Sequence, residues 1–198
     1  TNEVAQEGRR GALMVTLDCR HPDIMEFISS KDAADKVTGA NISVKWTEDF
    51  IEAAKNREEF TLRWPVEEDP EDADITKTVD AYEAFKQAAM YAHGYNQEAE
   101  ENATTFGGDP GCMFIDRMIE YSTDCGYPGI TVLSTNPCGE IGMHNDCCRL
   151  IALNFMSAVE QPFTTNASLN FDTIEKLAYE QQILLDNLVD LEIKHMNR

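Results

Sequence analysis

Residues 134 to 141 carry an amide, a thiol and a carboxylate at alternate positions. If this stretch runs extended, the two-residue period of a strand places Asn136, Cys138 and Glu140 on one face. These groups suit radical chemistry on a polyhydroxylated substrate, because a thiol can carry a hydrogen atom, a carboxylate can accept a proton and an amide can both donate and accept hydrogen bonds. On spacing alone an ordinary turn is the stronger interpretation, since Asn-Pro and Cys-Gly are common turn dipeptides.

A second thiol follows ten residues after Cys138, in the vicinal pair Cys147 and Cys148. His144 lies close to that pair in the sequence, so an alternative function is a thiol or metal-binding α/β module that uses these three residues. The chain has six cysteines but no C-x-x-C pair, and its four histidines are scattered. This pattern disfavours a structural zinc site. We therefore expect reduced thiols and no bound metal.

Length, composition and charge indicate a globular protein and disfavour some kinds of binding partner. The 198 residues include 36 acidic and 16 basic side chains, which gives a formal net charge of -20. Such a charge disfavours binding to nucleic acid or to an anionic membrane surface. The hydrophobic content of 42% is typical of a globular protein with a substantial core. Because the sequence shows no long apolar run, signal sequence or lipidation motif, we expect a cytoplasmic protein that binds neither nucleic acid nor membrane.

The elements around these residues predict an α/β architecture. Apolar runs and apolar alternation predict strands at residues 12–17, 40–46 and 60–64. Helical periodicity predicts helices at residues 21–30, from an N-cap at Thr47, and at residues 80–93, where Tyr82, Phe85, Ala89 and Met90 would form the buried stripe. Strand, helix and strand in this order are typical of α/β proteins.

A long amphipathic helix is predicted from an N-cap at Asn170 to about residue 197. Its apolar stripe is typical of a helix that packs against a core, and consists of Ile174, Leu177, Leu184, Leu188 and Leu191. The chain begins at Thr1 and closes on this helix without a glycine or proline stop. We therefore expect a piece of a longer protein.

Six blocks of sequence, in a fixed order, resemble the large, catalytic subunit of ribonucleotide reductase. They are residues 8–12, 21–24, 37–44, 62–65, 134–141 and 148–150. The resemblance extends over nearly the whole chain. It implies that residues 1–198 are a partial catalytic domain, the central portion of a ten-stranded α/β barrel. A finger loop at about 134–141 would carry Cys138 through the barrel centre. Because the other five blocks accompany the one that contains Cys138, a purely structural role for this cysteine becomes the weaker interpretation.

The resemblance implies roles for individual residues. Cys138 matches the cysteine that becomes a thiyl radical and abstracts the 3′-hydrogen of the ribonucleotide. Glu140 matches the carboxylate that takes the 3′-hydroxyl proton, and Asn136 matches the amide that holds the ribose hydroxyls. Cys148, in its Cys-Arg-Leu context, matches one member of the thiol pair that supplies two electrons as the 2′-hydroxyl leaves as water. Its neighbour Cys147 is expected to be structural.

The segment at about 31–41 matches the part of the family that relays the presence of a bound effector, a deoxynucleotide or ATP, to the substrate base. Lys36, Thr38 and Asn41 are the candidate residues for this relay. Arg10, the second of two arginines between Gly8 and Gly11, is a candidate for contact with the substrate.

The Asn-Pro-Cys-Gly-Glu form is more similar to adenosylcobalamin-dependent reductases than to many that take their radical from a separate metal-containing subunit, which is the alternative. The resemblance implies an oxidoreductase that reduces ribonucleoside diphosphates or triphosphates for DNA synthesis. It also implies a thioredoxin-type or glutaredoxin-type reductant and a homodimer when the subunit is complete.

Other parts of the family pattern have no counterpart in this sequence. They are the second redox cysteine, the substrate phosphate-binding loop and the tail cysteines that re-reduce the active site. We therefore expect flanking segments of the same subunit as partners, as in a split or intein-interrupted gene. We also expect no activity from the 198 residues alone.

Overall fold

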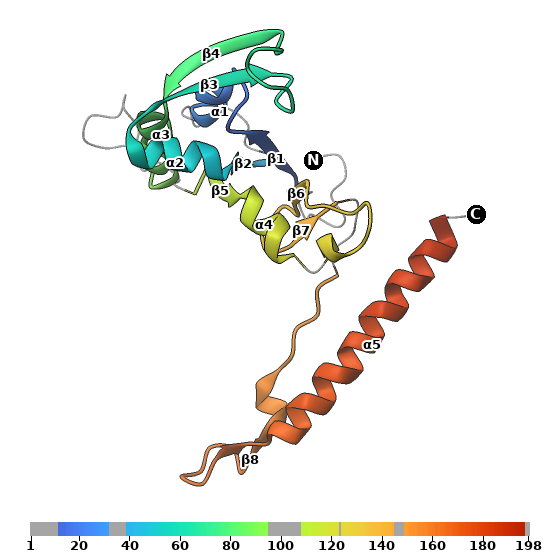
Figure 1. The fold of residues 1–198 in the computed structure, drawn as a ribbon. Coiled ribbons are helices and arrows are strands. Elements are labelled where there is room, and N and C mark those ends of the chain that lie inside the picture. The colour runs from blue at the N-terminus through green and yellow to red at the C-terminus, as the bar shows by residue number, and fades with distance from the viewer. Residues whose placement is uncertain (1–11, 32–38, 95–107, 123, 145–148, 197–198) are drawn as a thin grey trace. The chain divides into compact units, whose positions relative to one another are not determined.

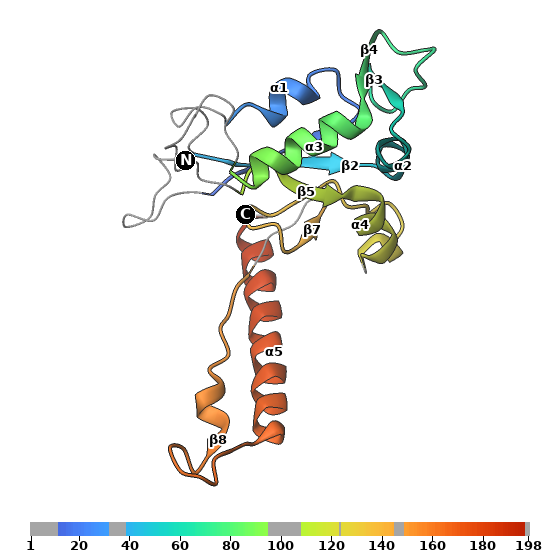
Figure 2. The same ribbon diagram turned by 90° about the vertical axis from the view of Figure 1, so that its left-hand side faces the viewer.

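The computed structural model describes residues 12–31, 39–94, 108–122, 124–144 and 149–196. The chain divides into two compact units, Thr1–Asp146 and Cys147–Arg198, and each is described by itself. Figures 1 and 2 show the elements of both units. None of the helices in the described ranges is both long enough and apolar enough to cross a membrane.

A three-stranded parallel sheet organises the first unit. The strand β2 (Asn41–Trp46) lies at its centre, with β1 (Met14–Asp18) on one side and β5 (Gly111–Phe114) on the other. Ile42, Ser43 and Val44 are all buried, because a central strand is covered on both faces. The structure therefore confirms the two strands predicted at residues 12–17 and 40–46, and β5 is parallel to both.

Helices connect these strands in the order expected for an α/β fold. The helix α1 (Ile24–Ile28) follows β1, and α2 (Glu48–Asn56) and α3 (Ala81–Ala92) lie between β2 and β5 in the sequence. In Figures 1 and 2, α1 and α3 lie side by side. Asp80 caps α3, because its side chain accepts a hydrogen bond from the backbone N–H of Glu83 at 2.9 Å.

An antiparallel hairpin separates α2 from α3. It consists of β3 (Glu59–Trp64), which the sequence predicted, and β4 (Ile75–Asp80), which it did not. Every residue of β4 except Val79 is exposed, so the strand lacks the apolar alternation that marks a half-buried strand.

The core of the first unit lies around β2 and these helices. The Trp46 ring packs against Phe50 at 5.1 Å and against Phe85 at 4.9 Å between ring centroids. The residues of α3 that are buried in this core are Ala81, Ala84 and Ala88. The predicted buried stripe of α3 was therefore wrong, because its smallest side chains face the core while Phe85 is only partly buried. Alanines allow α3 to approach α2 closely.

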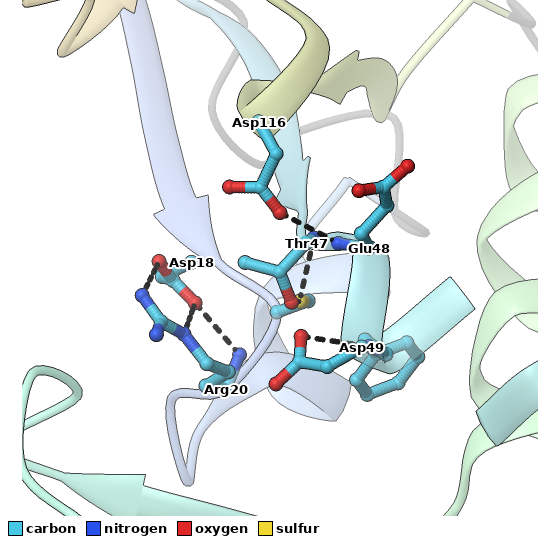
Figure 3. Close-up of polar contacts among 8 residues, drawn as sticks. Asp18, Arg20, Thr47, Glu48, Asp49 and Asp116 are labelled. Carbon is cyan, nitrogen blue, oxygen red and sulfur yellow. Dashed lines mark hydrogen bonds and ion pairs between the residues drawn. The ribbon is translucent and has the colours of Figure 1, made fainter. Parts of the chain in front are cut away.

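Polar contacts hold the carboxyl ends of the strands (Figure 3). Asp18 forms a two-pronged ion pair with Arg20, with both N–O distances 2.9 Å. Burial acts to raise the pKa of the Asp18 carboxyl, but the hydrogen bonds and charge of Arg20 outweigh it and hold that pKa below its usual value. Asp116 accepts a hydrogen bond of 2.7 Å from the backbone N–H of Glu48 at the start of α2.

Thr47 occupies the N-cap position of α2, as predicted, but its side chain does not cap the helix. Its hydroxyl instead lies 3.4 Å from the sulfur of Cys19, and its backbone N–H donates to the same sulfur at 3.4 Å. Cys19 is fully buried, and this burial raises the pKa of its thiol to about 12. Cys19 is therefore a structural cysteine with little thiolate at neutral pH.

The second unit contains the long helix that the sequence predicted. The helix α5 (Phe171–Met196) begins directly after Asn170, whose side chain accepts a hydrogen bond of 2.9 Å from the backbone N–H of Thr173. Before it come the 3-10 helix η2 (Phe155–Ala158) and a small hairpin of β8 (Val159–Glu160) and β9 (Ser168–Leu169).

The apolar stripe of α5 is not part of a core within its own unit. Leu184, Leu188 and Leu191 are 49%, 43% and 52% exposed. Within the described residues of the unit, the expectation that this stripe packs against a core was therefore wrong for these three leucines, whereas Ile174 and Leu177 are half-buried. The physical reason is size, because η2 and two strands of two residues each are too short to cover a 26-residue helix.

Candidate functional site

Residues 134–143 form a tight hairpin at the end of the first unit. Its strands are β6 (Ser134–Thr135) and β7 (Gly142–Met143), which pair antiparallel. Between them the backbone N–H of Gly139 donates to the carbonyl of Asn136 at 3.0 Å, and that of Asn136 donates to the carbonyl of Ile141 at 3.3 Å. Gly139 has φ of +80°, a conformation that glycine adopts without a steric penalty.

The chain therefore reverses direction across the candidate motif. The extended conformation that would place Asn136, Cys138 and Glu140 on one strand face was wrong, because the six residues from 136 to 141 close the hairpin. The turn dipeptides in the sequence correctly indicated this local geometry.

The turn nevertheless brings the amide and the carboxylate into direct contact. Asn136 is buried, with 6% of its surface exposed. Its Nδ2 donates to Glu140 Oε1 at 2.6 Å, and its Oδ1 accepts from the backbone N–H of Ile141 at 3.2 Å. Asn136 thus uses both functions of its amide to fix the turn and to orient the Glu140 carboxylate.

Cys138 lies at the tip of the hairpin as an exposed, free thiol. Together with Thr135, Pro137 and Gly139 it lines one side of a cavity of about 400 Å³. The other lining residues lie at or just before the amino ends of the three parallel strands: Met14, Asn41, Ile42, Ser43, Gly108, Asp109, Gly111, Cys112 and Met113. Cys138 therefore borders a space large enough for part of a small-molecule ligand.

Two contacts attach the hairpin to the sheet. Asn41, the first residue of β2, donates from Nδ2 to the carbonyl of Pro137 at 2.6 Å. The hydroxyls of Thr16 in β1 and Ser134 in β6 lie 3.3 Å apart. The first contact connects the amino end of β2 to the residue that precedes Cys138, and the second connects the middle of β1 to the start of the hairpin.

Close packing of β5 on β2 shapes the cavity floor. A Cβ added to Gly111 would lie 2.6 Å from Ser43 Oγ, so no larger residue fits there unless the serine moves. Glycine at position 111 therefore allows the two strands to approach at the point where they border the cavity.

Some of the predicted site residues lie within the described ranges and others lie outside them. It brings Asn136 and Glu140 together, and it places Cys138 and Asn41 on one cavity. Arg10, Lys36, Thr38 and Cys148 lie outside the described residues, so their roles stay predictions.

The thiol or metal alternative is likewise untested at its two cysteines. His144 is exposed, with Nδ1 3.1 Å from the carbonyl oxygen of Thr131, whereas Cys147 and Cys148 lie outside the described ranges. Within those ranges, no three His, Cys, Asp or Glu side chains are grouped to hold a metal ion.

Sequence reasoning missed two charged residues at this site. Asp109 lines the cavity, and its Oδ2 lies 2.7 Å from Lys31 Nζ. No local pattern could indicate this pair, because its members are separated by 78 residues and the Asp-Pro-Gly run around Asp109 resembles a surface turn.

A larger cavity, of about 650 Å³, lies at the carboxyl end of β2. Its walls include the aromatic rings of Trp46, Tyr82, Phe85 and Phe114, and none of the predicted site residues borders it. Size alone would favour this cavity, but reactive side chains favour the smaller one beside Cys138.

The cysteines should differ in reactivity. At pH 8 we expect iodoacetamide to modify the exposed Cys138 and to leave Cys19 unmodified until the chain is unfolded. As the pH rises from about 9 to 12, the unfolded chain releases the Cys19 proton before the folded chain does, so this residue makes the fold less stable over that window. Peptide mapping by mass spectrometry checks the modification, and rapid modification of Cys19 in the folded chain would contradict it.

A family model and several known relatives of this chain indicate the same protein family. The family model described as the ribonucleotide reductase barrel domain matches residues 2–198. A vitamin B12-dependent ribonucleoside-diphosphate reductase of Thermoplasma acidophilum is 31% identical over 194 residues, which cover 96% of this chain and 22% of the relative. A protein of the same name from Mycobacterium tuberculosis strain H37Rv is 28% identical over 185 residues, which cover 92% of this chain and 23% of the relative.

A vitamin B12-dependent ribonucleotide reductase of Rhodopirellula baltica is 25% identical over 203 residues, which cover 90% of this chain and 18% of the relative. The chain therefore spans only about a fifth of the length of these curated relatives.

Proposed function

The chain belongs to the ribonucleotide reductase barrel-domain family as a partial segment of the large subunit, and from this premise we propose that it supplies the radical-carrying thiol of a complete reductase. The observation that carries this proposal is the position of Cys138. It is a free thiol at the tip of a hairpin, it lines a cavity, and the hydrogen-bonded pair of Asn136 and Glu140 belongs to the same turn.

The proposed reaction begins at the Cys138 sulfur. Its thiyl radical takes the hydrogen atom from C3′ of the ribonucleotide, which re-forms the S–H bond and leaves a radical on the ribose. Hydroxide is a poor leaving group, so the 2′-hydroxyl departs as water only when a proton is added to it and one is removed from the 3′-hydroxyl. An exposed thiol on a cavity wall supports this step, because the sulfur must come into contact with the C3′ hydrogen.

Glu140 is proposed to accept the proton of the 3′-hydroxyl. A carboxylate suits this role only if an oxygen is oriented toward the substrate, and the 2.6 Å hydrogen bond from Asn136 Nδ2 restricts the orientation of Glu140. Asn136 is also proposed to contact the ribose hydroxyls. Its burial and its two hydrogen bonds within the turn favour a role in which it positions Glu140.

We propose adenosylcobalamin as the source of the radical, because the relatives are named vitamin B12-dependent. When bound, this cofactor would supply a carbon-centred radical able to take a hydrogen atom from a thiol. Among the described residues, Cys138 and Cys112 are both exposed and border the cavity, whereas Cys19 is buried, and the family resemblance selects Cys138 of the two. A radical from a separate metal-containing subunit is the alternative.

The remaining parts of the proposal rest on the family resemblance. Cys148 and a second thiol, which has no counterpart in this sequence, would together supply two electrons and two protons, one of them to the departing 2′-hydroxyl, and would close to a disulfide that a thioredoxin-type or glutaredoxin-type protein re-reduces. Lys36, Thr38 and Asn41 would relay the presence of a deoxynucleotide or ATP effector. The complete subunit would act in the cytoplasm as a homodimer, with flanking segments of the same subunit completing the barrel.

Assay of the complete subunit tests this function. With adenosylcobalamin and a dithiol reductant it should reduce ribonucleoside diphosphates or triphosphates, whereas the purified 198-residue chain should reduce neither. Product formation followed by chromatography of the nucleosides gives the measurement. Activity that requires a second, metal-loaded subunit would overturn the proposed cofactor, and absence of reduction under both conditions would overturn the proposed function.

A further inference from the structure

One carboxylate holds both ends of the connection between α1 and β2. Asp109 Oδ2 accepts a hydrogen bond from Lys31 Nζ at 2.7 Å, and Asp109 Oδ1 accepts one from the backbone N–H of Ile42 at 3.0 Å. Lys31 Nζ also donates to the carbonyl of Ala40. Lys31 lies just after α1 and Ile42 lies in β2, so Asp109 and Lys31 together fix the points where the connection starts and ends.

The ion pair of Lys31 and Asp109 is sheltered from solvent. The two side chains are 19% and 25% exposed, whereas those of the surface pair formed by Lys86 and Glu83 are 48% and 58% exposed. Water and salt screen a sheltered pair less than an exposed one. The Lys31–Asp109 pair is therefore better able to restrain backbone than the surface pair is.

The same contacts continue to the hairpin that carries Cys138. Asn41 lies between the two residues that Lys31 and Asp109 hold, Ala40 and Ile42, and its Nδ2 donates to the carbonyl of Pro137 at 2.6 Å. Its backbone N–H donates to the carbonyl of Leu13 at 2.8 Å, which attaches it to the residue just before β1 as well. A shift of Asn41 would thus be transmitted to the residue immediately before Cys138.

We propose that Asp109, paired with Lys31, is a positioning residue that sets the location of Cys138 through Asn41. The pair acts on the reacting thiol without touching it, and it couples the α1–β2 connection to the hairpin tip. This proposal rests on the proposed reductase function for its consequence in catalysis. Because the thiol must come into contact with the C3′ hydrogen of every ribonucleotide, loss of the pair should lower turnover of all of them by a similar factor.

Alkylation of Cys138 in the complete subunit tests the coupling independently of catalysis. Asp109→Asn keeps an acceptor for the Ile42 N–H but removes the ion pair, and Lys31→Met removes the same pair from the other side. In both variants we expect the rate of Cys138 modification relative to Cys125 to change by about threefold to tenfold, the effect of one lost hydrogen bond. Lys31→Arg, which keeps the charge, should restore most of the original rate.

Lys86→Met is the matched control, because it removes the exposed pair with Glu83 and should leave the relative rate unchanged. The catalytic measurement is kcat and KM for each of four ribonucleotides: we expect kcat to fall by a similar factor for all four in Asp109→Asn and Lys31→Met, with KM changed by less than about threefold. An unchanged kcat in both variants, or a relative alkylation rate within about 1.5-fold of the original in both variants, overturns the positioning role. Absence of turnover in the unmodified subunit would instead overturn the reductase function, and the alkylation result would still test the coupling.

Discussion

Cys138→Ser in the complete subunit abolishes ribonucleotide reduction, with turnover expected to fall at least about a thousandfold. An O–H bond is stronger than an S–H bond, so a serine at this position cannot form the radical at an accessible energy. Cys138 is an exposed free thiol, and exchange of sulfur for oxygen therefore disturbs little packing. The fold of the hairpin should survive, because its turn depends on Asn136 and Gly139.

Two measurements separate a chemical from a structural role for Cys138. Equilibrium binding of a ribonucleotide should change by less than about threefold in the variant, while single-turnover reduction disappears. Cys125→Ser is the matched control, because Cys125 packs beside the small apolar cluster of Met113, Ile115 and Val132 and does not line the cavity beside Cys138. A comparable loss of nucleotide binding in Cys138→Ser would show that the residue is structural.

The elements that could be predicted from the sequence are those with a local physical signature. The strands β1 and β2 have apolar runs or alternation, and α5 has a clear N-cap and a period of 3.6 residues. The strand β4 has neither, since it is exposed on both faces and owes its pairing to β3. Local pattern also predicted the bounds of α5 but not its surroundings, which depend on how much chain is present to cover it.

At the candidate site, the sequence indicated the chemistry through the residue types but did not predict their geometry. The types of Asn136, Cys138 and Glu140 indicated the chemistry, but the extended geometry was wrong because six residues close a turn. That turn makes the contact between Asn136 and Glu140, which strand alternation alone would not. The pair of Lys31 and Asp109 has no local signature, because its members meet only when β5 aligns with β2.

Glu140→Gln in the complete subunit should lower kcat by about a hundredfold to ten-thousandfold, the range associated with loss of a general base. The glutamine keeps a carbonyl oxygen where Asn136 Nδ2 now donates at 2.6 Å, so the turn and the orientation of the side chain are retained. What it loses is the ability to accept the 3′-hydroxyl proton. The effect should therefore appear in kcat, with KM changed by no more than about threefold.

The neighbouring amide gives a comparison that separates proton transfer from positioning. Asn136→Ala removes the hydrogen bond that orients Glu140 and the one that holds the Ile141 N–H in the turn, but it retains the carboxylate as a proton acceptor, so its loss of kcat should be smaller than that of Glu140→Gln. Glu52→Gln, at an exposed carboxylate of α2, is the control for loss of one negative charge and should retain full turnover. If Glu140→Gln raised KM and left kcat unchanged, Glu140 would be a binding residue, and another group would have to accept the 3′-hydroxyl proton.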